Sequence, residues 1–404
     1  MIVLSKEQIE EMVDPDQMMD QIEEAYRIYG SGEFYMPPRP TVEHENKQLM
    51  YMPCYTKDII GTKILSIFPE NSKLGLPSID GIVLLNDYTT GAPLAVMDGQ
   101  SVTAWRTGAV GGVGIRHLSR KDCRTVGIIG AGMQGFHQAV YACAARDIHT
   151  VYVFNHSDRD LTDYLERLKK AIDKEDVKVV QCKAVEELVR NSDIICTTTP
   201  STTPVLPDDK ELLRGKCIIA IGSYMPEMRE IPDAVLDLVD NVYIELPYAC
   251  EESGDLSQPL ASGKLTKDRI KLMHEYLVSG EKEIKEGQTT YFKSVGMGLF
   301  DLLSGWTAWA PFTFIIVGIM GYVVGAMTEK HDQYGWKVAA IFAAFVIKIV
   351  GYYIAEIILY GNFIAPISSV PGNVVQIAVA AVVVLIVIEP IEIAVKKIGI
   401  TQFA

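Results

Sequence analysis

The sequence predicts an α/β fold in which a parallel sheet is joined to a β-rich domain and followed by an all-α tail. Three observations support this prediction. Short apolar strands alternate with helical segments from residue 124 onward, a glycine-rich turn follows the first of these strands, and charged residues become rare beyond residue 305. Strands and helices that alternate in this way form a parallel sheet whose two faces are covered by helices.

The composition limits the classes of partner. The 404 residues carry a net charge of −14, and residues 305–404 contribute none of it because their five Lys balance five Asp or Glu. The acidic first part has no basic stripe, which argues against nucleic acid as a partner. The seven cysteines form no CxxC pair or Cys/His cluster, so we expect reduced thiols of a cytosolic protein and no metal site.

The first 118 residues predict an α+β domain. Ser5 and Gln8 have the spacing of a capping box, and a helical pattern runs from them to Tyr29. Residues 34–98 read as strands, and "GIVLLND" and "PLAVMDG" flank "YTTGA", which is typical of a hairpin. A helix is expected over 100–118. We expect residues 250–303 to return to this domain (1–118) and complete it.

Residues 119–249 predict the parallel sheet. Its strands are expected in "RTVGIIG", "TVYVFN", "VKVVQ", "DIICTTT", "CIIAIG" and "NVYIEL". Helices are expected over 132–146, 158–173 and 184–190, between successive strands.

The glycine-rich turn "GIIGAGMQG" lies between the first parallel strand and its helix. Gly130 permits the tight turn, Gly132 lets a pyrophosphate approach the backbone, and Gly135 lets the helix pack closely on the strand. Free N–H groups at the start of the helix, which includes Met133 and Gln134, would face the phosphates. The turn predicts a Rossmann-type nucleotide-binding domain, with a tight structural turn as the alternative.

The end of the second parallel strand bears on the choice of nucleotide. An acid there would bind the ribose 2′-hydroxyl of NAD, but this chain has Asn155, His156 and Ser157. Asn does not repel a 2′-phosphate, and His and Ser can donate to one, so the sequence tilts weakly toward NADP(H). The nearby acids Asp158 and Asp160 weaken this inference, although acids are also typical of a helix N-terminus.

Three cations lie in apolar or turn settings: Arg39 in "PPRPT", Lys63 in "GTKIL" and Arg106 in "TAWRTGA". Taken singly, each is typical of a solvated surface charge. Together with the glycine turn, the run "GLPSIDGIVLLNDYTTGAPLAVMDG" and the closing "FKSVGMGLFDL", they resemble the ornithine cyclodeaminase/mu-crystallin family over about residues 1–303.

The resemblance implies a homodimer whose subunits each pair a substrate-binding and dimerisation domain with a Rossmann NAD(P)-binding domain. It implies that the three cations bind the carboxylate of an amino-acid-derived substrate, with Lys63 at the imine end. It further implies that Ser78 lies beside the cofactor and that Thr198 and Ser223 lie near its ribose and nicotinamide.

One departure from the family narrows the expected reaction. Tyr224 stands where cyclodeaminases carry an Asp that activates the water or the imine, and a phenol with a pKa of about 10 is a poor base at neutral pH. We therefore expect an NAD(P)-dependent oxidoreductase that reduces imines or ketimines of amino acids, or oxidises an amino acid. The alternatives are ornithine cyclodeaminase, with bound NAD, and a transport or vitamin-binding protein whose enzyme half is inert.

The tail contains three apolar segments, at about 307–327, 337–360 and 373–395. Each is long enough to cross a hydrocarbon layer of about 30 Å, so we expect 305–404 to bind a lipid bilayer and to hold a cytoplasmic enzyme part at the cell membrane. A buried soluble helical bundle is the alternative. "PFTFIIVGIMGYVVGAM" and "GNFIAPISSVPGNVVQIAVAAVVV" resemble the later half of the membrane substrate-binding subunits of energy-coupling-factor vitamin transporters.

Three spans after a cytoplasmic domain would place Lys330, Lys337, Lys396 and Lys397 outside the cell, against the positive-inside tendency. Our hypothesis is therefore that two unrelated coding regions have been joined. A purposeful membrane-tethered reductase is the alternative.

Overall fold

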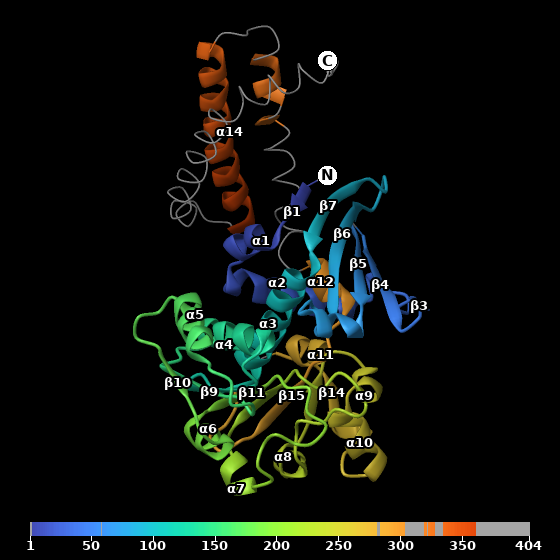
Figure 1. Cartoon of the computed structure of the whole chain (residues 1–404), viewed down its shortest axis with the longest axis vertical. Helices are drawn as coiled ribbons and strands as arrows, with labels where there is room; N and C mark the ends of the chain where they lie inside the picture. The colour runs from blue at the N-terminus through green and yellow to red at the C-terminus, as the bar shows by residue number, and fades with distance from the viewer. Residues whose placement is uncertain are drawn as a thin grey trace. The chain divides into compact units, whose positions relative to one another are not determined.

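The computed structural model describes residues 2–57, 59–280, 283–303, 319–320, 322–327 and 334–360 (Figure 1). The chain divides into two compact units, Met1–Gly305 and Trp306–Ala404. The first unit contains two β-sheets, and the helix α3 (Gly99–Leu118) packs against strands of both. This helix therefore joins the two halves of the first unit.

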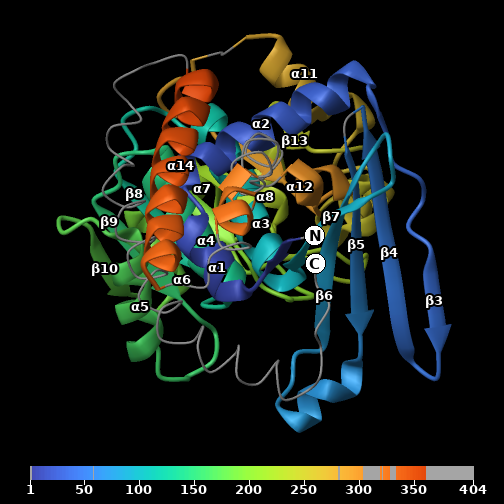
Figure 2. The ribbon, with the colours of Figure 1, turned by 90° about the horizontal axis from the view of Figure 1, so that it is seen from above.

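The first sheet has seven strands in the order β1-β7-β6-β5-β4-β2, with β3 paired to β4 (Figure 2). Their bounds are β1 Ile2–Leu4, β2 Phe34–Tyr35, β3 Thr41–His44, β4 Lys47–Thr56, β5 Ile59–Ile67, β6 Ile79–Asp87 and β7 Pro93–Asp98, with a 3-10 turn η1 at Pro69–Leu74. Strands β6 and β7 pair antiparallel, which confirms the predicted hairpin.

The register of this sheet sorts its side chains onto two faces. Met52, Lys63 and Val83 are aligned across β4, β5 and β6 and are all buried, whereas the next aligned row is Tyr51, Ile64 and Ile82. Because side chains alternate along a strand, the second row lies on the opposite face. Lys63 therefore lies on the inner, apolar face of the sheet.

The N-terminal helix predicted as one piece is two helices, α1 (Lys6–Met12) and α2 (Pro15–Ser31). The predicted capping box is confirmed, because the Ser5 side chain accepts from the N–H of Gln8 and the Gln8 side chain accepts from the N–H of Ser5. The break follows from Pro15, which fits only the first turn of a helix. Asp14 caps that new start and accepts from the N–H of Gln17 at 2.9 Å.

The second sheet has eight strands, all parallel, in the order β10-β9-β8-β11-β12-β15-β13-β14. The strands are β8 Thr125–Ile129, β9 Thr150–Phe154, β10 Lys178–Gln181, β11 Ile194–Thr197, β12 Cys217–Ala220, β13 Val242–Ile244, β14 Ile270–Leu272 and β15 Thr290–Lys293. All six predicted strands form, and the order of β10 to β12 is that of a Rossmann-type sheet. The predicted α/β class is confirmed.

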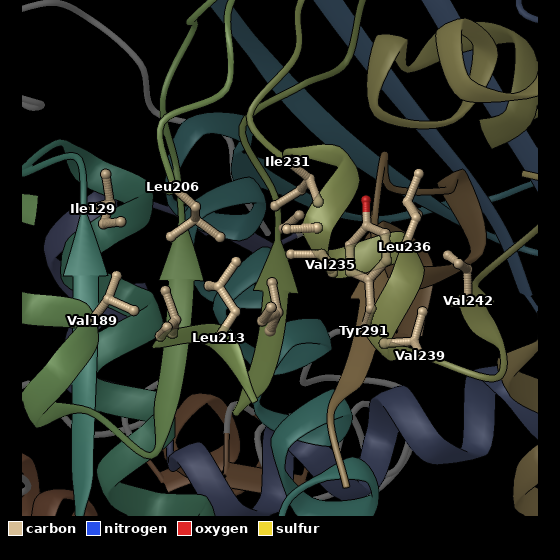
Figure 3. Close-up of a cluster of buried hydrophobic side chains, with 14 of the residues drawn as sticks. Ile129, Val189, Leu206, Leu213, Ile231, Val235, Leu236, Val239, Val242 and Tyr291 are labelled. Atoms are coloured by element: carbon tan, nitrogen blue, oxygen red, sulfur yellow. The ribbon is translucent and has the colours of Figure 1, made fainter. Parts of the chain in front are cut away.

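Helices and apolar side chains cover this sheet. The helices are α4 Met133–Ala145, α5 Thr162–Ile172, α6 Val185–Asn191, α7 Lys210–Leu213, α8 Asp233–Leu238, α9 Ala249–Glu252, α10 Gly254–Ser262 and α11 Met273–Val278, with a 3-10 turn η2 at Lys267–Arg269. A core cluster includes Ile129, Leu206, Leu213, Ile231, Val235 and Tyr291 (Figure 3). Burial of these side chains holds the strands whose ends form the candidate nucleotide site.

The segment 250–303, which we expected to complete the first domain, is shared between the two sheets. Strand β15 lies between β12 and β13 in the second sheet, and β14 is at that sheet's edge. All four residues of β15 are buried, including Tyr291 and Phe292, so the strand takes an interior position. The chain then crosses to the first sheet, where α12 (Gly298–Leu303) packs against β4 and β5.

In the second unit the structure describes the helix α14 (Tyr334–Tyr360), which covers the predicted apolar segment 337–360. The predicted segment 307–327 is described only at 319–320 and 322–327, and 373–395 lies outside the described residues. Among the helices that the structure describes, none has both the length and the apolar character that a bilayer-spanning helix requires.

Candidate functional site

The glycine turn follows β8 at the carboxyl edge of the second sheet. Gly130 has φ +103°, and a Cβ there would lie 2.8 Å from Oγ1 of Thr198. A Cβ at Gly135 would lie 2.1 Å from the carbonyl oxygen of Gly130, so packing excludes a side chain at both positions. A Cβ at Gly132 would meet nothing within 4 Å. Gly132 therefore leaves its backbone accessible, as a bound phosphate group requires.

The loop after β9 is tied to this turn. Asn155 accepts from the N–H of Ala131 at 3.1 Å and donates to the hydroxyl of Ser157 at 2.7 Å. Arg159, which the sequence analysis did not select, donates to the carbonyl of Ala131. His156 is exposed beside them. Asn155, His156 and Ser157 thus border the turn, and Arg159 adds a positive charge to the same loop.

The three residues that the family resemblance placed near the cofactor, Thr198, Ser223 and Ser78, have different surroundings in the structure. Thr198 donates to the carbonyl of Gly130 at 2.9 Å and therefore supports the turn directly. Ser223 is fully buried, and its hydroxyl contacts the carbonyl of Met228 and the hydroxyl of Ser253. Ser78 lies before β6, where its carbonyl accepts from the N–H of Phe68 at 2.7 Å. At the start of α4, Met133 is exposed and Gln134 half-buried.

A buried carboxylate that sequence reasoning missed, Glu230, links the loops after β11 and β12. Its two oxygens accept from the N–H and hydroxyl of Thr199, the hydroxyl of Thr197 and the N–H groups of Gly222 and Ser223 at 2.6–3.2 Å. Charged groups buried in protein are retained when they are hydrogen-bonded in this way. Glu230 therefore ties the loop after β11 to the loop after β12.

A second buried pair holds Glu230 in place. Asp255 accepts from the N–H groups of Glu230 and Ile231 at 2.6 and 2.9 Å. Its other oxygen lies 3.2 Å from Nζ of Lys293, which ends β15. This chain of contacts connects β11, β12 and β15 at their carboxyl ends.

The three predicted cations converge in the first half of the unit. Nζ of Lys63 on β5 and Nε of Arg106 on α3 lie 3.2 and 2.9 Å from the same oxygen of Asp301 on α12. The side chains of all three residues are at most 8% exposed. Asp301 was not selected from the sequence, although an acid within the apolar "GLFDLL" could have been flagged as a buried partner of the cations.

Arg39 reaches the same place from the loop between β2 and β3. It donates to the carbonyl of Gly296 at 3.2 Å, lies 3.6 Å from Glu252 and stacks over the ring of Tyr248. Gly296 has φ +82°, and a Cβ there would lie 2.4 Å from Nη1 of Arg106. Arg39 and Arg106 therefore both lie beside Gly296, just before α12.

The charges of this cluster depend on one another. Burial, opposed by Asp301 but reinforced by Arg106 and Arg39, lowers the pKa of Lys63 to about 8. Burial would raise the pKa of Asp301, but Arg106 and Lys63 outweigh it and hold that pKa below its ordinary value. Three cations thus face one buried carboxylate, Asp301, and Glu252 offsets part of the charge of Arg39 from 3.6 Å away. The positive charge that remains favours an anionic ligand.

A cavity of about 780 Å³ lies elsewhere, at the amino-terminal edge of the second sheet. Its lining includes Arg116, Arg120, Lys121, Arg146 and Lys285. None of the predicted site residues lines it, so cavity size does not identify the site described above.

Comparisons with known proteins place the first unit in a family. The profile of the ornithine cyclodeaminase/mu-crystallin family matches residues 1–309. The Delta(1)-pyrroline-2-carboxylate reductase of Bacillus cereus is 32% identical over 312 residues, which cover 75% of this chain and 94% of that protein.

Solved structures agree. Delta(1)-pyrroline-2-carboxylate reductase of Thermococcus litoralis, in complex with NADH and L-proline, aligns with a TM-score of 0.70 and 29% identity over 79% of this chain and 98% of that one. An archaeal alanine dehydrogenase dimer with bound NAD aligns with a TM-score of 0.66 and 27% identity, covering 75% and 93% of the two chains.

The tail has a match of its own. The profile of the S component of ECF-type riboflavin transporters matches residues 292–393. The two matched ranges overlap at residues 292–309, which include α12.

The contacts of Glu230 predict a large effect on stability. In Glu230→Ala, five hydrogen-bond donors lose their acceptor, so we expect the free energy of unfolding to fall by about 3 kcal/mol or more. Chemical denaturation followed by circular dichroism measures this change. The exposed neighbour Glu227 provides the control, since Glu227→Ala should change the free energy by about 0.5 kcal/mol at most. Equal stability of the two variants would contradict the role assigned to Glu230.

Proposed function

The chain belongs, through residues 1–309, to the ornithine cyclodeaminase/mu-crystallin family, and from this membership we propose that it is an NAD(P)-dependent oxidoreductase that reduces imines or ketimines of amino acids. The observation that carries the proposal is the convergence of Arg39, Lys63 and Arg106 around residues 296–301. Two relatives that match most of the first unit are a reductase named for a cyclic imino acid and a dehydrogenase named for an amino acid, alanine.

The cofactor of this proposal is NAD(P)(H), held at the carboxyl edge of the second sheet. The backbone at Gly132 is accessible for a pyrophosphate, and Gly130 and Gly135 permit the turn that presents it. Asn155 and Ser157 would border the adenosine ribose of the bound cofactor. Asn155 takes the position at which an NAD-binding site usually has an acid for the ribose 2′-hydroxyl. When bound, the nicotinamide supplies or accepts the hydride.

The substrate is recognised through its carboxylate. Two guanidinium groups and an ammonium group can hold a carboxylate in a fixed orientation, because arginine donates two parallel hydrogen bonds. Asp301 neutralises only part of the positive charge, so the cluster of Arg39, Lys63, Arg106 and Asp301 retains affinity for an added anion. Fixing the carboxylate also fixes the adjacent carbon, which is the carbon that gains or loses the hydride.

Lys63 is the proposed proton donor. During reduction the imine carbon gains a hydride and the imine nitrogen gains the proton that leaves Nζ of Lys63. A pKa of about 8 allows Lys63 to be charged at neutral pH and still to release its proton readily. Tyr224, which stands at the place of the cyclodeaminase Asp, is 47% exposed and offers no carboxylate for ammonia release.

The activity test uses the full chain purified in detergent. NADH or NADPH should be consumed with a five- or six-membered cyclic ketimine carboxylate, as measured by loss of absorbance of the reduced cofactor. Arg39→Gln should raise the KM for the ketimine by about 10- to 100-fold, since it removes one charge-assisted contact. Arg39 is tested because it is less buried than Arg106, and the exposed Arg214→Gln is the matched control. Proline and ammonia formed from ornithine, without net cofactor consumption, would instead support a cyclodeaminase.

The outer face of the first sheet supports assembly as a homodimer. Tyr51, Ile64 and Ile82 form an aligned row on the face opposite Lys63, and Ile82 and Leu49 are each 40% exposed. An apolar sheet face of this kind is stabilised when a second copy covers it. The dimeric state of the archaeal alanine dehydrogenase is consistent with this proposal.

A charge on that face tests the dimer. Ile82→Glu should convert the dimer to a monomer, because a carboxylate would be buried without a partner, and sedimentation analysis in detergent measures the change. Val180→Glu is the control, since Val180 is similarly exposed (37%) but lies on β10 in the other sheet. A dimer that survives Ile82→Glu would contradict the proposed interface.

The tail provides the proposed membrane attachment. Its few charges and its match to a membrane transporter subunit support binding of residues 305–404 to a lipid bilayer, with the enzyme unit in the cytoplasm. The expressed chain should sediment with membranes, resist an alkaline carbonate wash and be released by detergent. Release by carbonate alone would reject integration of the tail into the bilayer.

A further inference from the structure

Asp301 bridges the two buried cations of the cluster, Lys63 and Arg106, because both contact its carboxylate. One of its oxygens lies 3.2 Å from Nζ of Lys63 and 2.9 Å from Nε of Arg106, and its side chain is 2% exposed. It comes from α12, whereas the two cations come from β5 and α3. The position of Asp301 therefore sets where both buried cations lie relative to each other.

The surroundings of Lys63 explain why such a partner is needed. Its strand neighbours on the inner face of the sheet are Met52 and Val83, which are buried and apolar. An ammonium group in apolar surroundings loses its proton unless an anion compensates. The positive charges of Arg106 and Arg39 also lower the pKa of Lys63, as its burial does.

The other acids of the region are engaged elsewhere. Glu252 faces Arg39 at 3.6 Å. Glu245 accepts from the N–H groups of Val295 and Gly296 and so holds the turn before α12. On β4, Cys54 is buried with its pKa raised to about 12 by burial and by Asp301, so it stays neutral. Asp301 is therefore the carboxylate that the described contacts place against Lys63.

We propose that Asp301 is a positioning residue that keeps Lys63 protonated and aligned beside Arg106, so that Lys63 can deliver its proton to the imine nitrogen. This inference rests on the proposed reductase function. The arriving substrate carboxylate binds the remaining donors of Arg106 and the guanidinium of Arg39, while the shared oxygen of Asp301 holds the ammonium and Nε of Arg106 in place. Asp301 itself does not need to touch the substrate.

The role predicts a specific change in pH dependence. In the reducing direction Lys63 must be protonated, so kcat with saturating substrate should fall as the pH rises through about 8. Asp301→Asn removes the charge that favours the ammonium form, so this fall should move to lower pH by about 1 to 3 units. In the oxidising direction Lys63 must be neutral, so kcat should rise with pH, and Asp301→Asn should move this rise to lower pH as well. A merely structural defect would instead lower kcat by one factor at every pH.

Two further variants protect the test against a folding failure. Asp301→Ser also removes the charge but leaves room for water, and it should move the fall of kcat in the same direction. Asp301→Glu retains a carboxylate and should keep the fall near pH 8 even if kcat is reduced. The exposed Asp122→Asn is the control and should leave the profile unchanged.

The outcomes separate the two proposals. No ketimine reduction by the unsubstituted chain would overturn the proposed function. Reduction by the unsubstituted chain, with a pH profile that Asp301→Asn and Asp301→Ser leave in place, would overturn the role of Asp301 alone. If the pH profile moved by the same amount in Asp301→Glu, which keeps the carboxylate, the lost charge could not be the cause of the shift. That result would also overturn the role of Asp301.

Discussion

The bridge from Asp301 to Lys63 and Arg106 is the interaction on which the candidate site depends. Burying an ammonium or a guanidinium group is costly unless an anion accompanies it. Both cations are buried, and Lys63 lies between the apolar side chains of Met52 on β4 and Val83 on β6. The single carboxylate of Asp301 offsets part of the positive charge of both cations, which makes the three residues one buried cluster.

The same constraint explains the path of the chain after residue 250. To bring Asp301 to Lys63, the polypeptide must pass from the second sheet to the first, and it does so between β15 and α12. At the end of β15, Lys293 pairs with Asp255, which holds Glu230 and thereby the loops after β11 and β12. A few residues later, Asp301 joins the cation cluster. One short segment thus connects the candidate nucleotide site and the cation cluster of the first unit.

This segment also lies where two family matches overlap. The enzyme family matches residues 1–309 and the transporter family 292–393, and α12 falls within both ranges. The last element that the candidate site requires, α12, ends at Leu303, before the apolar tail begins. The tail can therefore differ from the family without removing a residue of the described site.

Local sequence was sufficient for the elements and for the nucleotide turn. The alternation of strands and helices, the capping box at Ser5 and the glycines at 130, 132 and 135 each follow from backbone geometry within a few residues, so the sequence determined them. The helix break at Pro15 was also readable from a local rule but was missed.

Tertiary structure decided the rest, because the partners are distant in the chain. Lys63 and Asp301 are 238 residues apart, and Glu230 gathers donors from two different loops. Whether a charged residue is a solvated surface group or a buried partner depends on which elements the fold places around it, and no local pattern specifies this. The sequence by itself therefore determined the α/β scaffold and the glycine turn and named the three cations as candidates through the family resemblance. Only the folded structure showed that the cations converge and which carboxylates hold them, since burial makes a charge require a partner.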